Sequence, residues 1–109
     1  MMFVATLLAL NLGSDISYKI GSEDFVGYGA KPASWSEGKP VVYVIQDWDG
    51  VNAHEKEVVE NLAAEGYAAF AIDIYGKNNR PKTMADNGKE AGKYYANPTL
   101  FMERITEGM

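Results

Sequence analysis

Apolar and polar side chains alternate along two short segments near the start of the chain. Residues 16–20, Ile-Ser-Tyr-Lys-Ile, follow a two-residue period that is typical of a strand with one buried face. Residues 21–24, Gly-Ser-Glu-Asp, have the composition of a turn, and residues 25–30 then predict the returning strand. The pattern therefore predicts an N-terminal β-hairpin, followed by a surface loop over residues 31–40 with its two prolines, two serines and glycine.

The hydrophobic pattern changes after residue 40. Residues 41–45, Val-Val-Tyr-Val-Ile, are an unbroken β-branched and aromatic run, which predicts a strand buried on both faces of a parallel sheet. Asn52 and Glu55 have the spacing of a capping box, and the helix that follows places Val59 on its apolar face and Glu55 toward water. Residues 67–74 predict a second buried strand. Strand, helix and strand form a βαβ unit, whose crossover is right-handed almost without exception.

Two further helices are predicted in the last third of the chain. Thr83 and Asp86 can cap a helix that runs to about residue 96, and Asn97-Pro98 has the residue types of an N-cap and a first helical position. We therefore expect an α/β fold: an N-terminal β-hairpin, a βαβ unit and two helices, all within residues 15–109.

Residues 1–14 form a separate apolar N-terminal segment. The run from Met1 to Leu12 is too short for a transmembrane helix, which needs about 20 residues. No basic residue precedes it, as a secretory signal would require. We expect a short buried element packed on the domain, with a degenerate export signal as the alternative, so a cytoplasmic location is favoured over export.

Composition and charge exclude several classes of protein. The 109 residues carry a net charge of −5, which argues against binding to nucleic acid or to an anionic membrane surface. The chain has no cysteine and one histidine, so disulfide scaffolds, thiolate metal sites and multi-histidine metal sites are excluded. We expect no metal and no cofactor.

Candidate chemistry lies in the loops after the two buried strands. Ligands of open α/β sheets bind outside the carboxyl ends of the strands. Two loops leave such ends here, over residues 46–52 and 75–82. The residues expected to form a site are Asp47, Trp48, Asp49, Tyr75 and Arg80.

Asp47-Trp48-Asp49-Gly50-Val51 has an alternative interpretation. It resembles the first motif of haloacid-dehalogenase-type phosphotransferases, which would make Asp47 the nucleophile and Asp49 the proton donor beside Mg²⁺. That family also needs a later Ser or Thr, a lysine and an acidic pair, and none stands clearly after Gly50. A calcium loop fits less well, because the glycine comes too early and no glutamate follows at the twelfth position.

A wider resemblance covers nearly the whole chain, from about residue 16 to residue 109. Its features are the buried strand, the Gln-Asp-Trp-Asp-Gly-Val-Asn loop, an acidic helix, the turn Leu-Ala-Ala-Glu-Gly-Tyr-Ala-Ala and the segment Asp-Ile-Tyr-Gly. In this order and spacing the chain resembles the N-terminal part of the dienelactone hydrolase family. The resemblance implies an α/β-hydrolase fold in which a Cys-Asp-His triad cleaves carboxylic esters or lactones.

The resemblance also implies roles for four residues. Asp47 matches a glutamate that contacts the resting nucleophile, and Trp48 matches the position whose backbone N–H helps to form the oxyanion hole. Tyr75 and Arg80 fall in the loop that borders the substrate pocket, where Arg80 could pair with a substrate carboxylate. Plainer interpretations remain open, in which Asp47, Asp49 and Trp48 shape the loop, Arg80 and His54 are solvated, and Asp73 hydrogen-bonds locally.

No Gly-x-Cys-x-Gly or Gly-x-Ser-x-Gly motif, the usual setting of the nucleophile in this fold, occurs in the 109 residues. We therefore expect a truncated, dienelactone-hydrolase-like chain that is inactive alone and takes a small ester or lactone only when a C-terminal half completes it. A non-catalytic binding or assembly module is the remaining alternative. An uncovered apolar strand edge at residues 41–45 predicts a homo-oligomer, formed by edge pairing or by exchange of the N-terminal segment.

Overall fold

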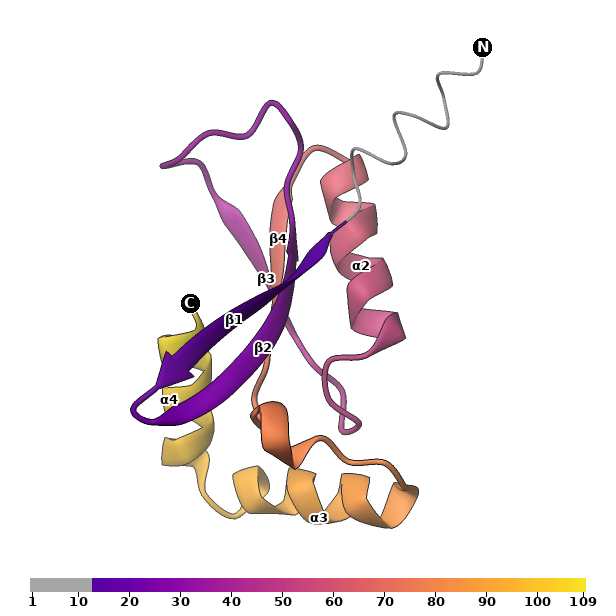
Figure 1. The fold of residues 1–109 in the computed structure, drawn as a ribbon, viewed down its shortest axis with the longest axis vertical. Coiled ribbons are helices and arrows are strands. Elements are labelled where there is room, and N and C mark those ends of the chain that lie inside the picture. The colour runs from indigo at the N-terminus through magenta and orange to yellow at the C-terminus, as the bar shows by residue number, and fades with distance from the viewer. Residues whose placement is uncertain (1–12) are drawn as a thin grey trace.

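The computed structural model describes residues 13–109, and the prediction for the segment from Met1 to Leu12 lies outside them. The elements in chain order are β1 (Ser14–Ile20), β2 (Glu23–Ala30), β3 (Val41–Ile45), α2 (Ala53–Ala64), β4 (Ala68–Ile72), the 3₁₀ turn η1 (Lys77–Asn79), α3 (Met84–Tyr95) and α4 (Pro98–Gly108). Figure 1 shows the strands crossing at the centre of the molecule, with the helices around them. The predicted hairpin, βαβ unit and two C-terminal helices are all present, so the α/β fold is confirmed.

The four strands form one mixed sheet in the order β1-β2-β4-β3. β1 and β2 pair antiparallel as a hairpin, and β2 also pairs antiparallel with β4. β3 and β4 pair in parallel through the crossover helix α2, from Val41 opposite Ala68 to Ile45 opposite Ile72. The loops that follow β3 and β4 therefore leave the same edge of the sheet.

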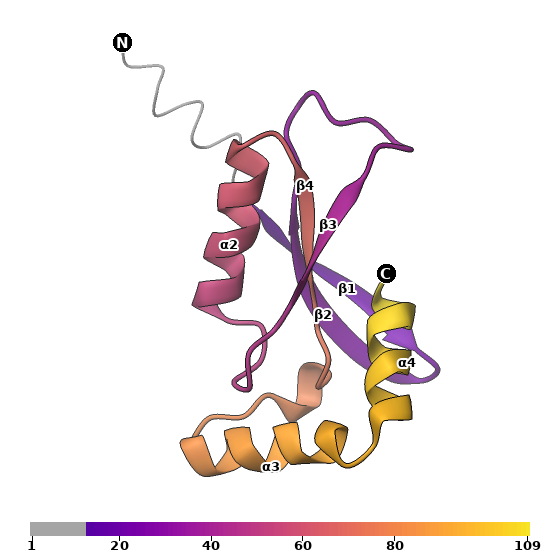
Figure 2. The same ribbon diagram turned by 180° about the vertical axis from the view of Figure 1, so that it is seen from behind.

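Helices α2 and α4 cover opposite faces of the sheet (Figures 1 and 2). Val59 of α2 packs in one core cluster with Ala69 and Ala71. Ile72, the next residue along β4, belongs to a second cluster against which Phe101 and Ile105 of α4 pack. Successive side chains of a strand point to opposite faces, so β4 contributes to both layers of the core.

The start of α2 follows the sequence prediction, with one correction. Asn52 is the N-cap and accepts a hydrogen bond from the His54 amide, while the Glu55 carboxylate accepts one from the Asn52 amide, which completes the capping box. We expected Glu55 to face water, and this is wrong, because its side chain is buried. The reason is that its carboxylate turns back toward the loop that precedes the helix.

β3 also differs from its prediction. It lies at the end of the strand order, and Val42 and Ile45 are 37% and 42% exposed. Buried strands were expected at both β3 and β4, and the prediction is confirmed for β4, where four of five residues are buried. β4 is flanked by a strand on each side and by a helix on each face, whereas β3 has β4 as its only neighbour among the described strands.

None of the helices within residues 13–109 is long and apolar enough to cross a membrane.

Candidate active-site edge of the sheet

Gln46 joins the two loops that leave the carboxyl ends of β3 and β4. Its side-chain oxygen accepts a hydrogen bond from the Ile74 amide at 3.0 Å, and its side-chain nitrogen donates to the Asp47 carbonyl at 3.3 Å. One side chain thus satisfies a backbone group in each loop. The two predicted site loops are therefore held side by side.

Buried Glu55 fixes the path of the loop after β3. One oxygen of its carboxylate accepts from the Asp47 amide, and the other accepts from the Asn52 amide, both at 3.1 Å. Hydrogen bonds to a charged acceptor are stronger than neutral ones, and they satisfy amides that would otherwise lack a partner. The loop is therefore anchored at both of its ends by the first turn of α2.

A tight turn lies between these two anchors. The Gly50 amide donates to the Asp47 carbonyl at 3.1 Å, and Gly50 has a φ of +86°, a conformation that glycine adopts without strain. Asp49 is directed at the side-chain amide of Asn52, which donates to it. The turn leaves Trp48 at its outer corner, with the residue 46% exposed.

Tyr75 holds the peptide carbonyl of Trp48. The phenol donates to that oxygen at 2.8 Å from the loop after β4. Within residues 13–109, the hydrogen bonds that shape the loop use the amides of Asp47, Gly50 and Asn52, and the Trp48 amide is not among these donors. The structure thus fixes the peptide group after Trp48 and leaves the Trp48 N–H for another acceptor.

An aromatic pocket of about 60 Å³ opens beside this peptide group. Tyr75 stacks on Tyr94 of α3 with ring centroids 5.5 Å apart, and Tyr94 meets Phe101 of α4 edge to face at 6.2 Å. The lining residues are Gln46, Asp47, Trp48, Ile74, Tyr75, Ala91, Tyr94, Tyr95 and Phe101. Helices α3 and α4 therefore close one side of the site, which the sequence pattern did not indicate.

Burial extends the pH range over which the phenol of Tyr75 is neutral. It raises the pKa of Tyr75 to about 12, with a smaller contribution from the negative charge of Glu90. Burial also raises the pKa of the neighbouring Tyr94. Tyr75 is therefore a hydrogen-bond donor at neutral pH, as its contact with the Trp48 carbonyl requires.

Arg80 lies in a different place from the one expected for a substrate-binding residue. One guanidinium nitrogen is 3.0 Å from a carboxylate oxygen of Asp73, whose side chain is fully buried. The guanidinium also donates to the carbonyls of Val26 and Val51. Arg80 does not line the aromatic pocket with Trp48 and Tyr75, and its role in substrate binding stays a prediction.

Asp73 was predicted to hydrogen-bond locally, and it does so with the Gly76 amide at 3.1 Å. It also accepts from the Val26 amide of β2 at 3.0 Å, a contact that no local sequence pattern would reveal. Asp73 and Arg80 together tie β2, the end of β4 and the start of α2.

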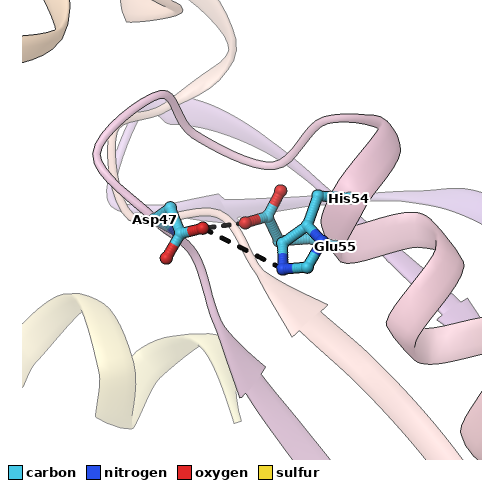
Figure 3. Close-up of side chains that lie close together, drawn as sticks. All are labelled: Asp47, His54 and Glu55. Carbon is cyan, nitrogen blue, oxygen red and sulfur yellow. Dashed lines mark hydrogen bonds and ion pairs between the residues drawn. The ribbon is translucent and has the colours of Figure 1, made fainter.

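Asp47, His54 and Glu55 lie close together at the start of α2 (Figure 3). Their potential ligand atoms all lie within 4.8 Å of one another, and His54 Nε2 is 4.0 Å from a carboxylate oxygen of Asp47. Both oxygens of Glu55 already accept backbone hydrogen bonds. Asp47 and His54 are exposed, as expected for His54. The hydrogen bonds between Glu55 and the loop after β3 explain why these side chains lie together, and we assign no metal to them.

Glu55 and Gln46 both hold the loop after β3, and neither was named as a candidate site residue from the sequence. The capping-box spacing does contain the signal for Glu55, because the N3 carboxylate of such a box reaches back toward the N-cap. Gln46 carries no comparable signal, since its role depends on a backbone amide 28 residues away.

Residues 25–108 match the sequence profile of the dienelactone hydrolase family. The chain belongs to the dienelactone hydrolase family. A relative from Salmonella typhi, assigned as a carboxymethylenebutenolidase, is 36% identical over 64 residues, which are 59% of this chain and 24% of that protein. A relative from Aquifex aeolicus with the same assignment is 31% identical over 99 residues, 88% of this chain and 38% of that protein.

A solved structure supports the same fold for this dienelactone hydrolase family member. It is the dienelactone hydrolase-like promiscuous phosphotriesterase P91 from metagenomic libraries, which superposes with a TM-score of 0.78 at 25% identity. The match covers 88% of this chain and 40% of P91. The chain thus spans about a quarter to two fifths of the length of these relatives.

Family membership decides between two interpretations of the Asp47–Gly50 loop. None of the matches supports a haloacid-dehalogenase-type phosphotransferase. The loop belongs to a dienelactone-hydrolase-like fold, in which Asp47 and Asp49 are held by contacts at the first turn of α2.

Proposed function

We propose that this chain supplies the oxyanion-binding edge of a carboxylic-ester or lactone hydrolase. The observation that carries the proposal is the peptide geometry around Trp48. The Trp48 N–H is not used in the hydrogen bonds of the loop. The peptide group to which it belongs is held through the Asp47 carbonyl, which accepts from the Gly50 amide and the Gln46 side chain, and the next peptide group is held by Tyr75. A fixed backbone N–H at the carboxyl edge of an α/β sheet can donate to the negative oxygen that develops when an ester carbonyl is attacked.

Preorganisation is what such a donor requires. A hydrogen-bond donor stabilises the transition state most when it needs no rearrangement during the reaction. Here Glu55 anchors the loop at Asp47 and Asn52, and Gln46 ties it to the loop after β4. The aromatic pocket next to the peptide group offers apolar surface to the acyl or alcohol part of a substrate.

The chain does not contain every group that the reaction needs. It has no cysteine and no nucleophile-elbow motif, so attack on the ester carbonyl must come from residues outside these 109. We therefore expect the isolated chain to be inert toward p-nitrophenyl acetate. Activity requires a partner segment with nucleophile, acid and base, and no cofactor is needed.

A chimera with the Aquifex aeolicus relative tests the proposal. This chain replaces the 38% of that protein with which it aligns, and p-nitrophenyl acetate hydrolysis is compared with the unmodified relative. The decisive variants are Trp48→Pro, which removes the N–H, and Trp48→Ala, which keeps it. We expect kcat to fall about 10²- to 10³-fold in Trp48→Pro, and far less in Trp48→Ala.

The two variants separate the backbone from the side chain. Circular dichroism establishes that both remain folded. A folded Trp48→Pro chimera with the activity of Trp48→Ala would show that this N–H does not bind the oxyanion. An active isolated chain would contradict the need for an external nucleophile.

A further inference from the structure

Gln46 uses both ends of its side-chain amide. The side-chain oxygen accepts from the Ile74 amide at 3.0 Å, and the side-chain nitrogen donates to the Asp47 carbonyl at 3.3 Å. A backbone N–H can only donate and a carbonyl can only accept, so the two partners determine which way the side-chain amide points. An ionised glutamate at this position would have no donor for the carbonyl, and a methionine would have neither group.

The Ile74 amide holds the Gln46 side chain in place. Ile74 is 2% exposed and belongs to the core cluster that also contains Ile72 and Tyr94. A buried backbone N–H without a partner is costly, and the oxygen of Gln46 is the acceptor that this N–H uses. The side chain of Gln46 is therefore attached to the packed core beyond the end of β4 as well as to its own loop.

The carbonyl to which Gln46 donates belongs to the same peptide group as the Trp48 N–H. Because a peptide group is planar, the direction of the Asp47 C=O bond determines the direction of the Trp48 N–H bond. The Gly50 amide is the second donor to this carbonyl, at 3.1 Å. A carbonyl oxygen has two lone pairs, so these two donors can engage both. The orientation of the Trp48 N–H thus follows from the contacts of Gln46 and Gly50.

The same two hydrogen bonds also strengthen the Trp48 N–H as a donor. Peptide resonance moves negative charge from the nitrogen to the oxygen, and a donor at the oxygen favours that charge separation. Hydrogen bonds that are linked in this way strengthen one another by about 10–30% each. The contact from Gln46 to the Asp47 carbonyl therefore makes the Trp48 N–H a better donor to a negatively charged oxygen.

We propose that Gln46 is a positioning residue of the oxyanion site. Its side-chain amide is held by the Ile74 amide, and it orients and polarises the peptide group between Asp47 and Trp48 without contacting the substrate. The inference rests on the proposed function, because Gln46 acts through the Trp48 N–H. The oxyanion forms only as the ester carbonyl is attacked, so loss of Gln46 should lower kcat and leave KM unchanged.

Two variants of this chain separate the two hydrogen bonds of Gln46. Gln46→Glu keeps an acceptor for the Ile74 amide but has no donor for the Asp47 carbonyl at neutral pH, whereas Gln46→Met removes both groups. Amide hydrogen exchange at Ile74 should rise about tenfold in Gln46→Met and change little in Gln46→Glu. The ¹³C chemical shift of the Asp47 carbonyl should move in both variants. Asn61→Met removes an exposed side-chain amide from α2 and is the control, which should change neither signal.

Hydrolysis of p-nitrophenyl acetate by the chimera with the Aquifex aeolicus relative tests the catalytic consequence. Gln46→Met and Gln46→Glu should each lower kcat about tenfold, a smaller loss than the one expected when Trp48→Pro removes the N–H. In the Trp48→Pro background, Gln46→Met should cause no further loss, because the N–H through which Gln46 acts is already absent. A residue that only stabilised the loop would lower activity in both backgrounds.

The possible results distinguish this inference from the proposed function. A Trp48→Pro chimera with full activity would overturn the proposed function, and the role of Gln46 with it. If Trp48→Pro is defective but the Gln46 variants have normal kcat, or if the losses add in the double variant, only the role of Gln46 is overturned. An unchanged Asp47 carbonyl shift in both Gln46 variants also overturns it. Should Gln46→Met fail to fold, Gln46→Glu keeps the contact with Ile74 and decides both experiments.

Discussion

The phenol of Tyr75 donates a hydrogen bond to the Trp48 carbonyl at 2.8 Å and thereby links the ends of two parallel strands. Residues 27 positions apart in the chain thus fix one peptide group. Because this peptide group directly follows the one that carries the proposed oxyanion donor, the Trp48 N–H, the contact connects loop stability with the proposed catalytic role.

Tyr75→Phe should lower the free energy of unfolding by about 1 kcal/mol, since it removes one net hydrogen bond and leaves the ring packing in place. The measurement is urea denaturation of the isolated chain. Tyr95→Phe is the control, because Tyr95 is 78% exposed and its hydroxyl forms no hydrogen bond with the described residues. Equal effects of the two changes would contradict a structural role for the Tyr75 hydroxyl.

Arg80→Met should destabilise the chain far more than loss of a surface ion pair. The change leaves the fully buried Asp73 carboxylate without its cation, and breaking such a pair costs about 2–4 kcal/mol when one partner is partly exposed. Lys19→Met is the control, because it breaks the exposed pair with Asp24. If Arg80→Met has the stability of the natural chain, the guanidinium is free to serve a ligand, as the sequence suggested.

Glu55→Gln should cost about 1–2 kcal/mol of stability. A neutral side-chain amide has one acceptor oxygen, so it cannot accept from the Asp47 and Asn52 amides through two oxygens as the carboxylate does. Glu57→Gln is a matched control in the same helix, because Glu57 is exposed. Thermal unfolding measures both. A Glu57→Gln variant as unstable as Glu55→Gln would attribute the effect to helix charge rather than to the loop.

The contact between Tyr28 and Glu60 should make stability depend on pH at both extremes. The Tyr28 hydroxyl, followed by the Gly13 amide, donates to Glu60 and lowers the pKa of its carboxyl group. The stability from this group is therefore present above the pKa of an unfolded glutamate, about 4.3, and is lost as the pH falls through the lower folded value.

At alkaline pH the same contact makes stability fall as the pH rises. The hydrogen bond to Glu60 raises the pKa of Tyr28 to about 12. The stability contributed by Tyr28 is therefore present below the pKa of an unfolded tyrosine, about 10, and is lost as the pH rises from there through the folded pKa. Tyr28→Phe should flatten both limbs of the stability profile, whereas Tyr67→Phe, at an exposed position, should leave them unchanged. The free energy of unfolding measured across pH checks both limbs.

Periodicity and capping signals predicted the elements because those signals are local. Asn52, Thr83 and Asn97 were identified as N-caps from their own neighbourhoods, and each side chain accepts the expected backbone hydrogen bond. The uncovered edge of β3 was expected, but the exposure of Val42 and Ile45 was not, because an apolar run has the same pattern in a central strand and in an edge strand. That difference depends on strand order, which long-range pairing determines.

At the candidate site, too, local sequence patterns predicted some features, whereas contacts between residues distant in the sequence determined others. The rule that ligands bind at the carboxyl ends of strands singled out the loops with Trp48 and Tyr75, and in the structure both residues line the aromatic pocket. It could not show that Arg80 turns away to Asp73, since this depends on a buried charge that only the folded chain creates. Whether Asp47 and Trp48 act in catalysis stays a prediction.

The segment from Gln46 to Glu55 has a practical consequence for protein engineering. The turn at Gly50 and both hydrogen bonds that anchor the loop to Glu55 lie within these ten positions, so much of its shape is determined locally. A segment of this kind can be grafted between a strand and a helix of another parallel sheet as one portable unit. The recipient would need donors to take the place of the Ile74 amide opposite Gln46, the Tyr75 hydroxyl on the Trp48 carbonyl and the Arg80 guanidinium on the Val51 carbonyl.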